Sequence, residues 1–300
     1  MRELTQACDA YFGLSQPPFG LTPNTDFYVD LPAQQQAFDV LMFALGSGEG
    51  FIKITGEVGT GKTLLCRRLL NQLRSRNEHS LYIANPALSA DGLWLAVARE
   101  LQLFTGGRSA GEVQADIQQA LLQLAAQGQR VVLIIDEAQS MPPATLEALR
   151  LISNLETEQQ KLVQIVLFGQ PELNDILALP SFRQLRQRIT YSSELQPLSS
   201  PEVLAVYLQQ RLAVAGYRGL PLFEAAAVQA LWQASGGVPR LVNILAAKTL
   251  LAAFGNGSRQ LQRRHVLAAV ADTDSANAVP ASYPGIRTGA LLGAALLVLL

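Results

Sequence analysis

The chain carries a glycine-rich stretch, GEVGTGKT at residues 56–63, between an apolar run and a helical pattern. The run FIKIT before it is typical of a buried strand, and leucines recur at helical spacing in the KTLLCRRLLNQLRSR that overlaps its end. The glycines, the lysine and the threonine have the G-x-x-x-x-G-K-[ST] spacing of a phosphate-binding loop. This succession of strand, loop and helix predicts an α/β fold with a nucleotide site.

The chemistry of such a loop gives each kind of residue a role. Glycines let backbone N–H groups wrap the phosphates, the Lys62 ammonium reaches the β- and γ-phosphates, and the Thr63 hydroxyl binds Mg²⁺. A glycine-rich turn without nucleotide is the alternative, and the flanking strand and helix disfavour it. We therefore expect ATP and Mg²⁺ as cofactors, with contacts from Gly56, Glu57, Val58, Gly59, Thr60, Gly61, Lys62, Thr63 and Leu64.

A second apolar run, VVLIID, is followed by a second acid. We expect Asp136 to bind Mg²⁺ through water and Glu137 to polarise the attacking water. The alternative is a strand-end acid that only opens a loop. A phosphate-binding loop upstream in the same chain disfavours that alternative.

Five further residues are catalytic candidates, each with a structural alternative. Gln170 follows the apolar run LVQIVLF and would sense the γ-phosphate or orient the water, unless it is a plain loop residue. One of Arg183, Arg186 and Arg188 would enter a neighbouring subunit's site as an arginine finger, unless all three form a solvated helix face. Arg240 would sense the γ-phosphate from a second domain, unless it only begins a helix.

Strand-like runs alternate with helical patterns as far as Pro197, which implies right-handed crossovers and a parallel sheet. Four helical patterns without a strand follow. Pro17, Pro18 and Pro23 disfavour a helix near the start of the chain. The expected divisions are an irregular segment at 1–32, a nucleotide-binding core at 33–197, a helical lid at 198–272, a linker at 273–287 and an apolar tail at 288–300.

The net charge and the apolar C-terminal run indicate whether the chain binds nucleic acid or a membrane. The formal net charge is −1, which argues against a broadly basic nucleic-acid surface but not against a local patch. The run GALLGAALLVLL, residues 289–300, would reach about 18 Å as a helix, whereas a hydrocarbon core is about 30 Å thick. Two interpretations stay open: partial insertion at the cytoplasmic leaflet, or the first half of a membrane-spanning helix. Both histidines, His79 and His265, are expected at the surface.

The order of GEVGTGKT, VVLIIDEAQ, IVLFGQPEL, RQLRQRI and GGVPRLVN resembles the ExeA/GspA family of secretion AAA+ ATPases, and so does the opening YFGLSQPPFGLTPNTDFYVDLP. The resemblance extends over residues 11–272. It implies an AAA+ core of five parallel strands with a helical lid, and ATP hydrolysis by a homo-oligomer. It also implies a membrane segment at the place of the tail, and work on a type IV (MSHA-like) pilus or a type II secretion machine at the cytoplasmic face of the inner membrane.

The same resemblance gives names to the candidate residues. Residues 56–63 match the Walker A motif, and Asp136 with Glu137 match Walker B. Gln170 corresponds to sensor 1, the segment 183–188 to the arginine finger, and Arg240 to sensor 2. Two other functions compete with an assembly ATPase: a DNA-associated AAA+ ATPase of the transposition-helper or initiator kind, which the near-neutral charge disfavours, and a scaffold that binds ATP without turnover.

Overall fold

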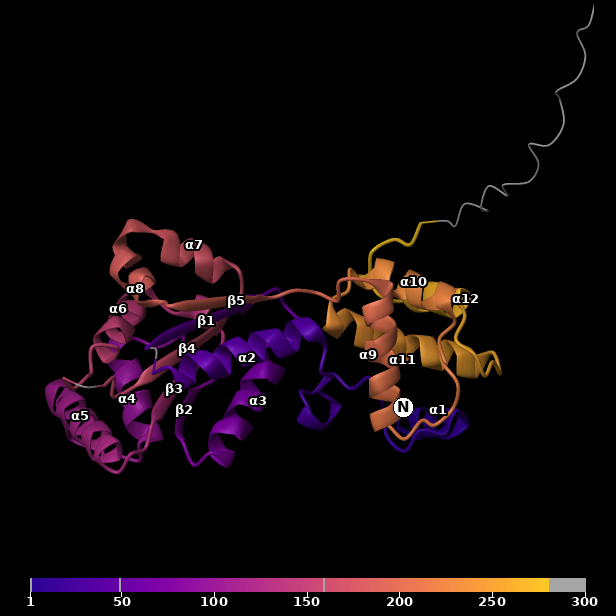
Figure 1. Ribbon diagram of the computed structural model, residues 1–300. Helices are drawn as coiled ribbons and strands as arrows, with labels where there is room; N and C mark the ends of the chain where they lie inside the picture. Colours follow the sequence, from indigo (N-terminus) through magenta and orange to yellow (C-terminus); the bar gives the residue numbers. More distant parts are fainter. Residues whose placement is uncertain (1, 49, 159, 281–300) are drawn as a thin grey trace, which may run out of the picture.

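The computed structural model describes residues 2–48, 50–158 and 160–280. Within these residues the core is one parallel sheet of five strands in the order β2-β3-β4-β1-β5 (Figure 1). This confirms the predicted parallel α/β architecture. The strands are β1 (Phe51–Gly56), β2 (His79–Ile83), β3 (Val131–Ile135), β4 (Gln164–Gly169) and β5 (Tyr191–Leu195).

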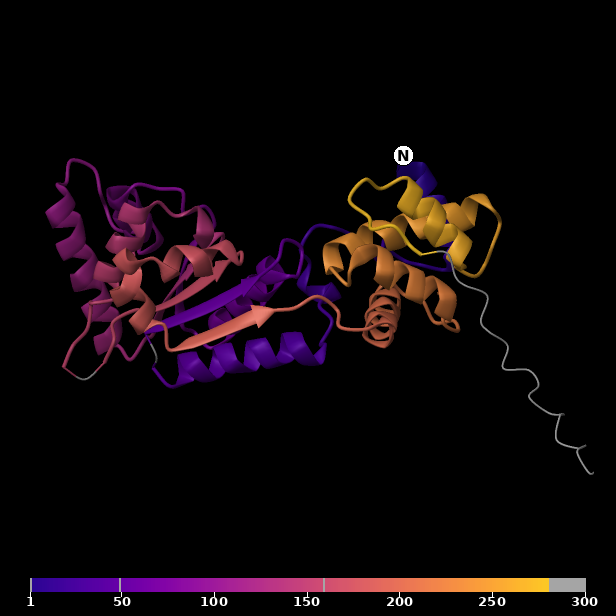
Figure 2. The same ribbon diagram turned by 90° about the horizontal axis from the view of Figure 1, so that it is seen from above.

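Helices cover both faces of the sheet, as the continuous apolar strands require. Alternate strand residues point to opposite faces, so Ile134 packs on the face of α2 and α3, whereas Leu133 packs on the face of α4, α5 and α6. The helices of this core are α2 (Pro32–Gly46), α3 (Lys62–Ser75), α4 (Ala90–Glu100), α5 (Ala110–Ala126), α6 (Pro143–Ile152), α7 (Glu172–Ala178) and α8 (Arg183–Arg188). Figures 1 and 2 show the two layers on either side of the strands.

Within the described residues four helices follow the last strand, in agreement with the four helical patterns that the sequence shows after Pro197. They are α9 (Pro201–Val214), α10 (Ala225–Ser235), α11 (Pro239–Gly255) and α12 (Arg263–Ala271). The connection from β5 is fixed to this helical region, because Leu198 donates its N–H to the carbonyl oxygen of Gly237 at 2.8 Å. Gly237 has a φ of 73°, and a Cβ there would lie 2.3 Å from the Leu198 carbonyl oxygen. Only glycine fits that approach.

The start of the chain corrects the prediction of an irregular segment at 1–32. Residues Arg2–Phe12 form helix α1, because the prolines that disfavour a helix all lie after it. Cys8 and Phe12, one helical turn apart, are buried in the hydrophobic core of the helical region. Helix α1 accordingly packs against α11, a helix from the other end of the described chain (Figure 1).

Residues 13–31, here called the N-terminal strap, run from the helical region to the core. The strap contains the short helix η1 (Thr25–Phe27). Ser15 donates its N–H to the carbonyl oxygen of Ala215 at 2.8 Å, and the ring of Phe19 meets Phe223 edge-on with centroids 6.2 Å apart. At its other end Asp30 pairs with Arg68 of α3 at 3.3 Å. The strap therefore bridges the two parts of the molecule.

His265 corrects a second expectation, since its side chain is only 1% exposed. Its Nδ1 accepts the backbone N–H of Gln262 at 3.0 Å, so it caps the start of α12. Burial, followed by the positive charge of Arg264, lowers the pKa of the imidazole. His265 is therefore a structural residue of the helical region.

Among the described residues there is no helix with the length and apolar character needed to cross a bilayer. The apolar tail at 288–300 and part of the linker at 273–287 lie outside the described residues.

Candidate nucleotide-binding site

The phosphate-binding loop joins β1, an inner strand of the sheet, to the start of α3. Gly56 is packed so closely that a Cβ would lie 2.8 Å from both the Leu195 carbonyl oxygen and the Thr60 hydroxyl. Gly61 has a φ of 103°, in the left-handed region that favours glycine. The first and third glycines of the motif are thus required by geometry, and the loop places its backbone N–H groups around the N-terminus of α3.

Lys62 lies inside this loop with only 6% of its side chain exposed. Its Nζ donates to the carbonyl oxygens of Gly56 at 2.6 Å and Glu57 at 2.9 Å. Burial lowers the pKa of the ammonium, while the charges of Glu137 and Asp136 oppose this effect. The lysine is therefore held at the place where a β- or γ-phosphate would need a counter-charge.

Asp136 follows β3 and is 4% exposed. One carboxylate oxygen accepts the backbone N–H of Glu137 at 2.9 Å. Burial raises the pKa of this carboxyl group; the neighbouring Glu137 charge adds to the shift, while hydrogen bonds from the Glu137 backbone and the Thr63 side chain oppose it. The Thr63 hydroxyl and the Asp136 carboxylate thus lie together, as two oxygen ligands of the kind that Mg²⁺ prefers.

Glu137 adopts a left-handed backbone conformation, with a φ of 52°, directly after Asp136. Its Oε2 accepts Gln139 Nε2 at 2.6 Å and Gln170 Nε2 at 3.2 Å. Gln170 follows β4, which pairs with β3, so its side chain lies beside Glu137 at the same edge of the sheet. Gln139 was missed, although its short distance from the acids in the motif DEAQ was a usable signal.

Most of the candidate site residues line one cavity of about 210 Å³. Lys62, Thr63, Glu137, Gln170 and Arg240 all line it. Residues that the sequence did not point to line the same cavity: strap residues 20–24 and, from the helical region, Tyr207, Arg211, Pro239 and Asn243. For the strap residues, the only signal in the sequence was that this segment is rich in proline and aromatic residues. The cavity is therefore built by the core, the helical region and the strap together.

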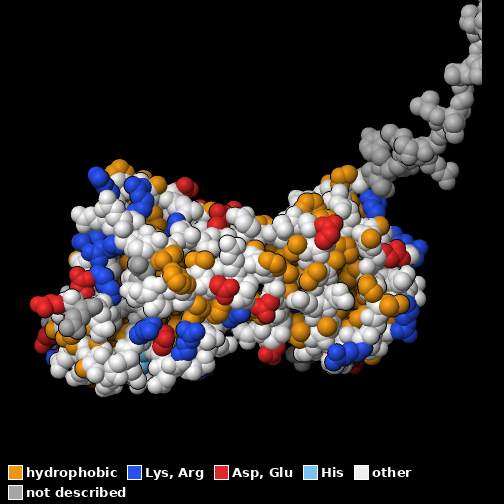
Figure 3. Space-filling view, in the orientation of Figure 1, with side chains coloured by type: hydrophobic (Ala, Val, Ile, Leu, Met, Phe, Trp, Pro, Cys, Tyr) orange, Lys and Arg blue, Asp and Glu red, His pale blue; other side chains and the backbone are white. Residues whose placement is uncertain are grey.

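The three arginines of α8 do not line this cavity. Arg188 donates to the Ser153 hydroxyl at 2.9 Å and Arg186 to the Ala178 carbonyl oxygen at 3.2 Å. Arg183 is exposed, and its side chain has no hydrogen bond or ion pair within the described ranges. Lys and Arg side chains gather at this end of the core, around α6 and α8 (Figure 3). A role for one of them in a neighbouring subunit's site stays a prediction, and Arg183 is the one left available.

Comparison with known proteins shows which proteins this chain is similar to. Residues 45–177 match the family model described as AAA domain. Over 252 residues the chain is 44% identical to general secretion pathway protein A of Aeromonas hydrophila, covering 84% of this chain and 46% of that protein. The chain thus spans about half the length of this curated relative.

Solved structures share the fold at low sequence identity. Cdc6p from Pyrobaculum aerophilum superposes with a TM-score of 0.61 at 19% identity, covering 84% of this chain and 68% of that one. The Aeropyrum pernix ORC2 protein, solved as ADPNP–ADP complexes, gives a TM-score of 0.59 at 17% identity, covering 84% of this chain and 72% of that one.

The parallel sheet and the phosphate-binding loop, together with the matched domain model, show a P-loop fold of the AAA type. Within that fold class, the chain is similar to general secretion pathway protein A.

Proposed function

We propose that the chain is a Mg²⁺-dependent ATPase that couples ATP binding and hydrolysis to assembly of an envelope machine. The observation that carries this is the set of groups around one cavity: a buried ammonium at Lys62, a carboxylate at Glu137, an amide at Gln170 and a guanidinium at Arg240. Hydrolysis of a phosphoanhydride needs charge stabilisation and a positioned water, and these are the groups that supply them.

The residues present fit the metal that such a reaction uses. Thr63 and Asp136 would hold Mg²⁺, the first directly and the second through water. When bound, the ion neutralises charge on the phosphate oxygens. Lys62 holds the phosphates, Glu137 accepts a proton from the attacking water, and Gln170 and Arg240 contact the γ-phosphate.

An apolar cavity of about 50 Å³ adjoins the loop and would receive the edge of the adenine base. Leu64, Leu195, Tyr207 and Pro239 are among its lining residues. Apolar walls with few polar groups are typical of a base-binding site.

The decisive experiment compares wild type with Glu137→Gln and Lys62→Ala. Glu137→Gln keeps the shape of the side chain but removes its basicity, so it should bind ATP and hydrolyse it at least about 100-fold more slowly. Lys62→Ala should lose nucleotide binding, because the phosphates would lack their counter-charge. Wild-type turnover by Glu137→Gln would refute the assignment of the base.

The machine is proposed from the relative's name and from the motif order. The similarity to general secretion pathway protein A supports work on a secretion machine, and we propose that the chain belongs to the ExeA/GspA family. A finer proposal is a role like that of MshM, which acts in biogenesis of the mannose-sensitive haemagglutinin (MSHA) pilus. We also propose that the protein forms homo-oligomers and works at the cytoplasmic face of the inner membrane.

Fractionation tests the location. The full gene product should stay in the membrane pellet through an alkaline wash, and removal of the residues after 281 should release an active ATPase. Recovery of the full-length protein in the soluble fraction alone would contradict the membrane location.

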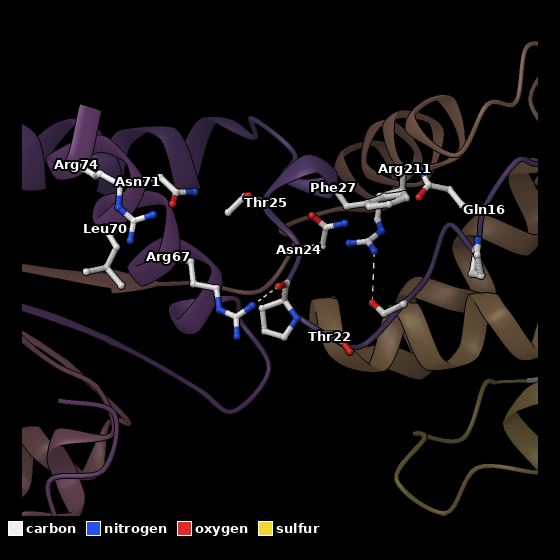
Figure 4. Close-up of a pocket in the computed structure, with 13 residues that line it drawn as sticks. Gln16, Thr22, Asn24, Thr25, Phe27, Arg67, Leu70, Asn71, Arg74 and Arg211 are labelled. Carbon is white, nitrogen blue, oxygen red and sulfur yellow. Dashed lines mark hydrogen bonds between the residues drawn. The ribbon is translucent and has the colours of Figure 1, made fainter. Parts of the chain in front are cut away.

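A DNA-associated ATPase is kept as the second candidate because of one groove. A cavity of about 710 Å³ shares strap residues with the nucleotide cavity and is lined by Arg67 and Arg74 of α3 and by Arg211 of α9 (Figure 4). None of its 13 lining residues is Asp or Glu. Stimulation of the ATPase by duplex DNA, lost in Arg74→Glu and falling steeply with salt, would favour this candidate over the envelope function.

A further inference from the structure

We propose that Gln139 is a positioning residue that holds the water-activating carboxylate of Glu137. The proposal rests on the ATPase function proposed above and adds to it a residue that the Walker and sensor assignments leave out. The juxtaposition that carries it is a closed set of hydrogen bonds between Glu137, Gln139 and Gln170.

Both ends of the Gln139 amide are used. Its Nε2 donates to Glu137 Oε2 at 2.6 Å, and its Oε1 accepts the backbone N–H of Gln170 at 3.0 Å. These partners fix which way the amide points, because a carboxylate only accepts and a backbone N–H only donates. The side chain therefore ties the end of β3 to the end of β4, the two strands that carry the catalytic candidates.

The backbone prepares this contact. Glu137 has a φ of 52°, and the short helix η2 (Ala138–Ser140) begins directly after it. Ser140 closes the turn by donating its N–H at 2.9 Å and its hydroxyl at 2.8 Å to the Glu137 carbonyl oxygen. A left-handed glutamate is costly and persists only where its surroundings hold it. The turn brings the Gln139 side chain back against the carboxylate two residues earlier.

The facing strand leaves room for the amide. Gly169 ends β4, and a Cβ added there would lie 3.3 Å from Gln139 Oε1 and 2.8 Å from Leu173 Cδ2. A glycine at this position lets the Gln139 amide lie close to the strand end. The position of Gln139 is thus specified from both strands.

The consequence for catalysis concerns the two oxygens of the Glu137 carboxylate. Oε2 accepts both amide donors, whereas Oε1 has no hydrogen bond among the described residues. The bonds to Oε2 hold the carboxylate plane, so Oε1 is the oxygen presented to a water. Glu137 and Gln170 line the nucleotide cavity but Gln139 does not. Gln139 should therefore act on kcat and leave the affinity for ATP unchanged.

Two substitutions separate hydrogen bonding from packing. Gln139→Met keeps the volume and removes both bonds, so kcat should fall about 10- to 100-fold with KM for ATP changed less than about twofold. Gln139→Glu replaces the donor with a second carboxylate against Glu137. Repulsion between the two carboxylates should displace the Glu137 side chain, so kcat should fall at least as far as in Gln139→Met, with KM for ATP again changed less than about twofold.

Gln119→Met, on the exposed face of α5, is the matched control and should leave both kcat and KM unchanged. Thermal unfolding of each variant reports folding separately from activity. A wild-type kcat in both Gln139 variants would refute the positioning role while leaving the ATPase intact. An inactive wild type that still binds ATP would instead overturn the proposed hydrolysis, and with it this inference.

Discussion

The backbone N–H of Arg240, at the start of α11, donates to the carbonyl oxygen of Gly59 in the phosphate-binding loop at 3.1 Å. The helical region therefore rests directly on the loop that holds the phosphates. Movement of this region and occupancy of the loop are expected to be coupled, because neither can shift without breaking this bond. The contact also explains why the side chain of Arg240 lines the cavity.

Gly59→Ala tests this contact. Gly59 has a φ of 87°, and a Cβ would lie 2.7 Å from the Cβ of Arg240. The substitution should weaken ATP binding about 10-fold or more and lower stability by roughly 2–4 kcal/mol, combining left-handed strain and overpacking. Gly128→Ala is the matched control, since its φ is 73° and nothing lies within 4 Å of the added Cβ. Equal effects in the two variants would assign everything to the backbone conformation.

Asp136→Asn should stabilise the protein while abolishing Mg²⁺-dependent turnover. Burial raises the folded-state pKa of Asp136, so the charged form is disfavoured in the folded state. The stability of wild type relative to Asp136→Asn should therefore fall as the pH rises from the unfolded pKa of about 3.9 to the raised folded value, and stay low above it. Near neutral pH we expect a melting temperature higher by a few °C in Asp136→Asn. Chemical unfolding of both proteins over this pH range measures the difference.

Arg183→Ala should lower turnover without affecting folding or ATP affinity, if Arg183 completes a neighbour's site. Specific activity should then rise with protein concentration, because a site is complete only where subunits meet. Arg188→Ala is the comparison: it removes the two bonds to Ser153, so stability should fall by about 1–2 kcal/mol. Concentration-independent activity from a strict monomer would exclude a finger in trans.

Arg211→Met should release the N-terminal strap. The guanidinium is 6% exposed and donates to the Pro18 carbonyl oxygen at 2.7 Å and to the Tyr207 hydroxyl at 3.2 Å. Loss of these charge-assisted bonds should lower stability by about 2–3 kcal/mol and speed proteolysis within residues 13–31. Limited proteolysis followed by mass spectrometry locates the cuts. The exposed Arg218→Met is the control, and identical cleavage in both variants would show that Arg211 does not hold the strap.

The sequence by itself determined the parallel α/β core, the four later helices and the positions of Lys62, Asp136 and Glu137. These features depend on local sequence. Strands and helices are predicted by the period of their apolar residues, and the phosphate-binding loop needs its glycines and lysine at fixed spacing. The N-terminal cap of α4 is equally local, since the Ser89 hydroxyl accepts the N–H of Gly92, three residues later, at 3.1 Å.

Only the tertiary structure decided what closes the site. Ser15 and Ala215 are 200 positions apart in the chain, yet they hydrogen-bond and bring the strap to the nucleotide cavity. Cys8 and Phe12 of α1 and the side chain of His265 are buried because distant segments cover them, and no local pattern in the sequence indicates that. The Gln139 side chain is positioned by the backbone N–H of Gln170, at the end of the neighbouring strand β4. A sequence shows which chemical groups a chain carries. Contacts between distant residues form only when the whole core is buried, because burial of the core determines which distant segments pack together.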